Sequence, residues 1–328
     1  MVFRVIAAAL LAAGSGAAIT NTRFEVRGQI LPHRVASVSL HAVASPFAVS
    51  ALAGPDGRFR FKDLPPGAYM LSVATRLGAA VRKTVEVGPL NADRNGRIPI
   101  SINMDSEALL RDGAATLSAS AWQVPEGAQR EYEQALRKVA KRDFDGALAS
   151  LHHAVDIAPR FTAAWNQLGT MAYQSQQYPQ AESCFRRGLE ADPNAFEPLV
   201  NLGGVLLNLG NFEEALKYNS EAVRHRPEDA LAQSQLGMSY ALLNRLEAAE
   251  EHLLLAIRID AHHFSRPQLT LADVYLRKNQ PGRAADQLET FLREHPDWPA
   301  AAKMRGQISE WRSRSGQIPE ARVAEQNK

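Results

Sequence analysis

Two periods of hydrophobic residues divide the chain. Between residues 22 and 104, apolar side chains alternate with polar ones, as Phe59 and Phe61 do on either side of Arg60. Turns rich in glycine and proline, such as the one at Asp56-Gly57, separate the short alternating runs. Alternation with a period of two is typical of strands that bury one face, and several short strands at this spacing predict an N-terminal β-sandwich.

From residue 128 onward the apolar positions follow the helical period, and the pattern recurs at steps of 34 residues. Residues that keep this register are Ala147, Ala181, Ala215 and Ala249 at one position, with Ala284 after a step of 35 residues, and Gly169, Gly203 and Gly237, each after a leucine, at another. A repeat of this length predicts two antiparallel helices per unit. The units should stack into an all-α superhelical solenoid, because one helix pair cannot bury its apolar face alone.

The recurring small residues predict how the two helices of a unit touch. We expect the glycine of the first helix to let the second helix approach closely, with the alanine of the second helix as the other half of the contact. Prolines such as Pro193 should end the second helix, because proline cannot continue the helical hydrogen-bond ladder.

These units resemble the tetratricopeptide repeat (TPR). The unit 162–195 carries most of the family's pattern, in Trp165, Leu168, Gly169, Tyr178, Ala181, Phe185 and Pro193. The register predicts five repeats, at 128–161, 162–195, 196–229, 230–264 and 265–298. Residues 299–313 begin like another first helix and then turn polar, which predicts a capping helix, and residues 314–328 are predicted to be a polar tail.

The N-terminal half resembles the carboxypeptidase regulatory-like family, whose fold is a transthyretin-like sandwich. The resemblance covers residues 22–104 and is carried by the strand Arg27-Gly28-Gln29-Ile30 and by GPDGRFRFKDLPPGAYMLSV, which starts at Gly54. It implies an accessory module of exported proteins, in which Gly57, Pro66-Gly67 and Tyr69 have structural roles. Related sandwiches bind sugars. Glycan binding is therefore the alternative function for this half. The absence of tryptophan, which would stack on a sugar ring, counts against it.

The first residues indicate export. A short apolar run, Val5 to Ala13, follows a single arginine and precedes small residues, so residues 1–19 are predicted to be a signal peptide leading to the periplasm or outside the cell. A buried helix or an uncleaved anchor is the alternative. No later stretch is long and apolar enough to predict a membrane span in the mature chain. Residues 105–127, dominated by small residues, are predicted to be a linker.

Composition and motifs do not favour catalysis, cofactors or nucleic-acid binding. The net charge is +2, although residues 22–105 hold 11 basic and 6 acidic side chains and residues 128–297 hold 18 and 23. No phosphate-binding loop, nucleophile elbow or zinc-site spacing is present, and Cys184 is the single cysteine. The pairs His152-His153 and His262-His263 are predicted to be solvated or capping residues. We therefore expect no enzyme, no metal and no cofactor; a catalytic function would need a site at the domain junction.

The TPR resemblance implies a binding groove lined by the first helix of each repeat. Gln167, Asn201 and Gln235 occupy the sixth position of three successive repeats. An amide offers a donor and an acceptor together, so this row could pair with an extended peptide backbone, as in the similar asparagine ladder of the O-linked N-acetylglucosamine transferase solenoid. The alternative is that the amides tie neighbouring helices together. Further groove candidates are Asn166, Tyr173, Asn208, Met238, Asp273 and Arg277.

These observations predict an exported, non-enzymatic scaffold that binds a protein or peptide partner in its groove and associates with the cell envelope. The family's carboxylate clamp for chaperone tails is missing, since Thr170 and Leu231 stand at two of its positions. Docking to cytosolic chaperones is therefore not expected. The alternative function is glycan binding by the β-sandwich, with the solenoid as its support.

Overall fold

The computed structural model describes residues 23–33, 35–43, 47–74, 80–104, 124–296 and 298–316. The predicted signal peptide, residues 105–123 of the predicted linker and residues 317–328 of the predicted tail lie outside the described residues. The described residues form two compact units, one ending at Asp229 and the other beginning at Ala230, and each unit is described by itself.

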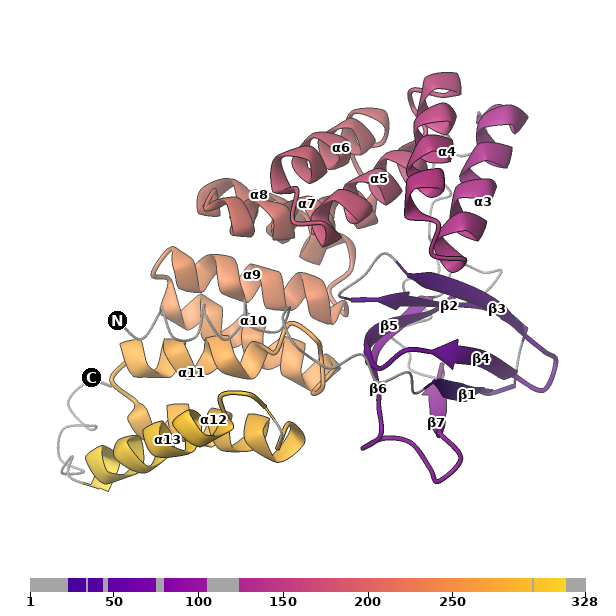
Figure 1. Cartoon of the computed structure of the whole chain (residues 1–328). Helices are drawn as coiled ribbons and strands as arrows, with labels where there is room; N and C mark the ends of the chain where they lie inside the picture. The colour runs from indigo at the N-terminus through magenta and orange to yellow at the C-terminus, as the bar shows by residue number, and fades with distance from the viewer. Residues whose placement is uncertain are drawn as a thin grey trace. The chain divides into compact units, whose positions relative to one another are not determined.

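The N-terminal part of the first unit is a two-layer β structure, as the alternating sequence predicts (Figure 1). One sheet has the strand order β4-β1-β7 and the other the order β3-β2-β5-β6. Their bounds are β1 (Phe24–Leu31), β2 (Ala36–Ala42), β3 (Ala48–Ala53), β4 (Arg58–Leu64), β5 (Gly67–Ala74), β6 (Ala80–Val87) and β7 (Arg97–Asn103). β1 runs parallel to β7 and antiparallel to β4, and all neighbours in the second sheet are antiparallel.

The core of this β domain is built from the inward-facing members of the alternating pattern. Gly28 lies directly opposite Phe59, and a Cβ added to it would lie 1.9 Å from the Phe59 ring. The glycine thus makes room for the aromatic ring. The buried Tyr69 donates its hydroxyl hydrogen to the Pro65 carbonyl oxygen at 2.8 Å, which satisfies its one polar group.

The described residues from 126 onward are mostly helical. The first unit contains α3 (Glu126–Ala140), α4 (Phe144–Ile157), α5 (Thr162–Gln174), α6 (Tyr178–Ala191), α7 (Phe196–Leu209) and α8 (Phe212–His225). The second contains α9 (Ala230–Leu242), α10 (Leu246–Ile259), α11 (Pro267–Arg277), α12 (Pro281–Glu294) and α13 (Ala301–Gly316). Consecutive helices from α3 to α12 pack as pairs, so the predicted β-sandwich followed by a helical-repeat solenoid is confirmed. α3 begins inside the predicted linker, and α13 extends beyond the predicted cap.

The glycine of each first helix marks a close approach to the second helix, as predicted. A Cβ on Gly169 would lie 2.5 Å from the Phe185 ring, one on Gly203 1.8 Å from Asn219 Oδ1, and one on Gly237 2.7 Å from Leu253 Cγ. The expected partner was wrong, however. The nearest residue is not the alanine but the residue four positions later, which lies on the same face of the second helix one turn further along.

A left-handed residue recurs in the turn between the two helices of every repeat. These residues are Arg142, Gln176, Gly210, Asn244 and Asn279, with φ of 64°, 60°, 81°, 60° and 58°. A left-handed residue just after a helix ends it and turns the chain back. The recurrence gives each repeat the same short turn although only one of the five residues is a glycine.

None of the described helices is both long enough and apolar enough to cross a membrane.

Candidate functional site

The first helices of the second and third repeats, α5 and α7, carry most groove candidates of the first unit. Asn166, Gln167 and Tyr173 lie on α5, and Asn201 and Asn208 lie on α7. Because the repeat register is kept, equivalent positions of the two helices lie near one another.

The amides of Asn166 and Asn201 bond to each other across the two repeats. Asn201 Nδ2 donates to Asn166 Oδ1 at 2.9 Å, and both side chains are half-buried. A side-chain amide has two N–H donors and an oxygen that can accept twice. The bond ties α5 to α7, as the alternative for this row supposed, and it still leaves donors and acceptors on both amides.

Tyr173 and Asn208 form a second link between the same helices. Asn208 Nδ2 donates to the Tyr173 hydroxyl oxygen at 3.2 Å and to the Gly204 carbonyl oxygen at 2.9 Å. The Tyr173 ring meets Tyr178 edge-on at 5.6 Å, yet 37% of Tyr173 stays exposed. Tyr173 therefore packs between repeats and also presents part of its ring at the surface.

Gln167 differs from its neighbours. It is half-buried on α5, and its side chain makes no hydrogen bond to any other residue in the part of the chain that the structure describes. None of the described residues therefore uses the hydrogen-bonding groups of this amide, which is next in sequence to the partly used amide of Asn166.

Arg82 of the β domain contacts the third repeat near its ends. Arg82 Nη2 donates to Glu197 Oε1 at 2.8 Å, and Arg82 Nη1 lies 3.4 Å from Asp229 Oδ2. Arg226 also reaches Glu197 Oε1, at 3.1 Å, and lies over the Phe196 ring. Desolvation would raise the pKa of Glu197, but the two guanidinium groups outweigh it and hold that pKa below its usual value. The carboxylate at the second position of this repeat is thus already paired.

The remaining predicted residues lie in the second unit, where Gln235, Asp273 and Arg277 all have internal partners. Arg277 donates to the Ala241 carbonyl oxygen and to Asn244 Oδ1, both at 2.7 Å, and lies 3.5 Å from Asp273. Burial raises the pKa of Asp273 despite this arginine. Arg277 therefore ties α11 to the end of α9. Gln235 and Met238 lie half-buried on α9.

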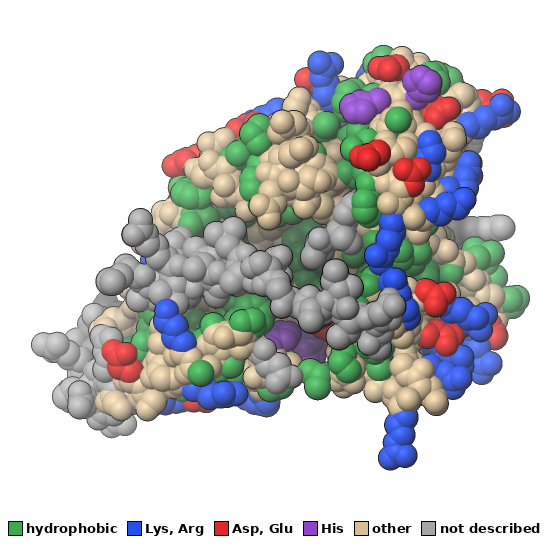
Figure 2. Space-filling view, viewed as in Figure 1, with side chains coloured by type: hydrophobic (Ala, Val, Ile, Leu, Met, Phe, Trp, Pro, Cys, Tyr) green, Lys and Arg blue, Asp and Glu red, His purple; other side chains and the backbone are tan. Residues whose placement is uncertain are grey.

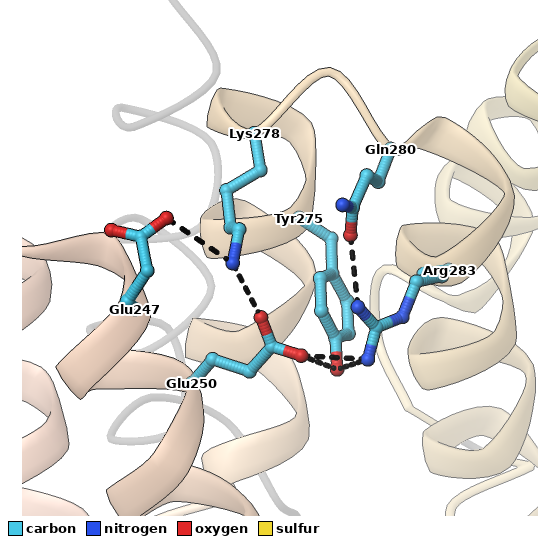
Figure 3. Close-up of polar contacts among 6 residues, drawn as sticks. All are labelled: Glu247, Glu250, Tyr275, Lys278, Gln280 and Arg283. Atoms are coloured by element: carbon cyan, nitrogen blue, oxygen red, sulfur yellow. Dashed lines mark hydrogen bonds and ion pairs between the residues drawn. The ribbon is translucent and has the colours of Figure 1, made fainter. Parts of the chain in front are cut away.

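A polar cluster that the sequence did not reveal joins α10, α11 and α12 (Figure 3). Glu250 Oε2 accepts from Lys278 at 2.7 Å, and its Oε1 accepts from Arg283 at 2.7 Å and from the Tyr275 hydroxyl at 3.2 Å. The Arg283 guanidinium also lies 4.0 Å from the centre of the Tyr275 ring. Nothing in the sequence distinguishes Glu250 from the other carboxylates on the helices.

The protonation behaviour of this cluster fits a structural cross-link. Burial would raise the pKa of Glu250, but hydrogen bonds from Lys278 and Arg283 hold it below its usual value. Burial and the neighbouring Glu250 charge raise the pKa of Tyr275 to about 12, and the bond to Glu250 raises that of Lys278. A general acid or base needs a pKa moved toward neutrality, and all three shifts run the other way.

The described histidines test the prediction of solvated or capping residues and the possibility of a metal site. His263 is buried rather than solvated, and it bonds the Ser265 hydroxyl at 2.7 Å and accepts from the Ser265 backbone N–H at 3.2 Å, a contact of the capping kind. No three possible metal ligands come together among the described residues.

The described aromatic residues of the β domain, Phe24, Phe47, Phe59, Phe61 and Tyr69, are all at most 7% exposed. They offer no flat surface to a sugar ring, so glycan binding is not favoured.

Comparisons with known proteins agree with the repeat architecture. Residues 129–265 match the family model of the cilia and flagella-associated protein 70 middle TPR-like domain, and residues 269–324 match a tetratricopeptide repeat model. Human cell division cycle protein 16 homolog is 31% identical over 134 residues, 38% of this chain and 20% of the relative. Human protein O-mannosyl-transferase TMTC3 is 30% identical over 139 residues, 38% of this chain and 15% of the relative. The chain thus spans a fifth or less of the length of these two relatives.

Among solved structures, YrrB, described as a TPR protein with an unusual peptide-binding site, aligns with a TM-score of 0.48 at 22% identity, over 57% of this chain and 98% of YrrB.

The helix pairs, their register and the two family models define the class. The chain is a tetratricopeptide-repeat protein with an N-terminal β domain. Proteins of this class are in general non-catalytic scaffolds for protein interaction, and the repeats of this chain form a protein-interaction scaffold of the TPR type.

Proposed function

We propose that the chain is an exported adaptor that binds an extended protein segment along the first helices of its repeats. The observation that carries this proposal is Gln167, whose amide has no hydrogen-bond partner among the described residues and lies next to the half-satisfied Asn166–Asn201 pair. Amides with unused donors and acceptors suit the backbone N–H and C=O groups of an extended segment. The exposed part of Tyr173 offers an apolar contact beside them.

The charged groups near the groove candidates are already paired within the chain. Glu197 is paired with Arg82 and Arg226, and Arg277 is held by Asp273 and by the end of α9. These ions are committed to contacts within their own units. A partner would therefore be recognised through amides and an aromatic ring, which favours backbone contacts over a charged sequence motif.

Replacing Gln167 with alanine should weaken partner capture without unfolding the protein, because no hydrogen bond among the described residues is lost. The loss of one bond predicts a roughly 2- to 10-fold drop in partner captured from a cell-envelope extract. Gln180, exposed on α6, is the matched control, and Gln180→Ala should capture as the unchanged protein does. Adding Asn201→Ala and Gln235→Ala should deepen the loss. Unchanged capture by the folded triple variant would eliminate the amide row.

Export is part of this proposal, and the apolar run from Val5 to Ala13 followed by small residues supports it. Cleavage should leave a mature chain that begins close to residue 20. Intact mass measurement of the protein recovered from the envelope checks this. A chain that retains Met1 and fractionates with the cytoplasm would contradict it. The carboxypeptidase regulatory-like identity of the β domain remains a proposal supported by its sequence motif, and it suits an exported protein.

A further inference from the structure

The outward face of the sheet β4-β1-β7 concentrates positive charge. The cationic side chains that strand alternation turns away from the core are Arg58, Arg60 and Lys62 on β4, Arg27 on β1 and Arg97 on β7. We call this set the basic face. Among the acidic residues of these strands and their turns, Glu25 lies within the basic face, and Asp56 and Asp63 lie at the two ends of β4. Asp56 approaches Arg58 at 3.7 Å, and Asp93, in the turn before β7, accepts from the Arg97 backbone N–H at 2.9 Å.

The basic face is not neutralised by its own carboxylate. Arg27 and Arg60 lie directly opposite each other on β1 and β4, and both approach the same Glu25 oxygen, at 3.0 Å and 3.7 Å. Hydrogen bonds from Arg27, with the charges of Arg27, Arg60 and Lys62, hold the pKa of Glu25 below its usual value. Like charges placed opposite each other on a sheet destabilise it. One carboxylate shared by two guanidinium groups leaves a positive surplus at the surface.

The charge extends across the sheet. Basic residues confined to an edge strand commonly protect against edge-to-edge aggregation. Here β4 is an edge strand, but Arg27 lies on the central strand β1 and Arg97 on the opposite edge, β7. Figure 2 shows Lys and Arg side chains gathered over the region of β1 and β4, with acidic side chains in the minority. Edge protection alone does not account for cations on all three strands.

Exposed apolar side chains border the basic face. Leu31 ends β1 in the same outward alternation as Arg27 and is 39% exposed, and Val35 in the next connection is 45% exposed. Surfaces that bind the bilayer interface combine apolar side chains with Lys and Arg that attract anionic lipids.

A nucleic acid fits this surface less well. No described outward position of β1, β4 or β7 is aromatic, so the face offers no platform on which bases could stack. A sheet face also presents neither the helix nor the two-stranded ribbon that enters the major groove.

We propose that the basic face docks the chain onto a bilayer that contains anionic lipids, with Leu31 and Val35 entering the headgroup region. This goes beyond the adaptor function and does not depend on it, since it rests on residues of the β domain alone. The arginines and Lys62 contact lipid phosphates, and docking brings the β domain to the membrane surface.

Vesicle co-sedimentation of the full chain tests the proposal. The protein should bind phosphatidylcholine vesicles that contain phosphatidylglycerol and not vesicles of phosphatidylcholine alone. Binding should weaken as the screening length falls from ~30 Å at 0.01 M salt to ~8 Å at 0.15 M. Because each basic residue near an anionic surface changes binding roughly fivefold, the variant Arg58→Gln/Arg60→Gln/Lys62→Gln should bind on the order of 100-fold less.

The matched control removes the same charge from exposed helical positions. Arg130, Arg137 and Arg224 have side chains that are 73%, 65% and 65% exposed, and replacing all three with glutamine should leave vesicle binding nearly unchanged. Leu31→Ser should weaken the binding that survives at high salt. Equal losses in the two triple variants would overturn the proposal, as would no binding to anionic vesicles at low salt. Polyphosphate binding that is sensitive to Arg58 and Arg60 but occurs without vesicle binding would also overturn it.

Discussion

Replacing Gly203 with leucine should destabilise the third repeat by about 1–3 kcal/mol, because it overpacks a well-packed helix pair. Even a Cβ at this position would lie 1.8 Å from Asn219 Oδ1. Asn219 is completely buried, so it cannot move into solvent to make room. Urea unfolding followed by circular dichroism measures the change.

Gly306 is the control for this substitution. It lies exposed inside α13, and an added Cβ would meet nothing within 4 Å. Gly306→Leu should therefore stabilise the helix slightly, since glycine is a poor helix former. A double-mutant cycle between Gly203→Ala and Asn219→Ala should show that the second change relieves part of the cost of the first. If Gly203→Leu unfolds at the same urea concentration as the unchanged protein, the helix pairing described above is contradicted.

Replacing Glu250 with alanine should cost about 1–3 kcal/mol, because three charged or polar donors lose a shared acceptor. Lys278, Arg283 and Tyr275 all bond this carboxylate, whose side chain is 15% exposed. Glu247 on the same helix is a close control. It approaches Lys278 at 3.4 Å, but its side chain is 84% exposed, so Glu247→Ala should change stability by well under about 1 kcal/mol. Equal effects of the two substitutions would contradict the role assigned to the cluster.

The contribution of Glu250 should also depend on pH in one direction. Its pKa in the folded protein is lower than the usual 4.5, so the contribution is present above that value and is lost as the pH falls through the lower, folded value. The stability difference between the unchanged protein and Glu250→Ala should therefore shrink in acid. A difference that persists well below pH 4.5 would show that the carboxylate acts by packing rather than by charge.

The fold was predictable because apolar and small residues carry both the two-residue alternation of the strands and the helical repeat. Backbone geometry places such residues on the buried face of a strand or helix. The alternating pattern does not mark the strand β3, because its sequence AVSALA is mostly small residues and shows no strong alternation. The partner of each repeat glycine was also missed. The repeat register identifies a spacing that recurs within this chain. The contact, however, depends on which residue of the second helix lies opposite the glycine of the first helix. Nothing in the sequence marks Asn219 as that residue.

The polar contacts were less predictable than the fold. Arg82 is one of several basic residues of the β domain, and Glu197 lies more than 100 positions further along the chain, so no local pattern joins them. Glu250 and Arg283 come together because one repeat separates them, yet charges at helix surfaces are too common for this spacing to be informative. The amide row could be proposed from spacing alone. Its division into the bonded Asn201 and the unbonded Gln167 required coordinates.

Site-specific photo-crosslinking at Gln167 tests the adaptor proposal most directly. A photoreactive residue placed at Gln167, and separately at the exposed Glu190 on α6, is irradiated in intact cells, and the linked peptides are read by mass spectrometry. The account predicts links from position 167 to one segment of another protein and no such links from position 190. Links of equal yield from both positions, or links from position 167 only to this chain itself, would contradict it.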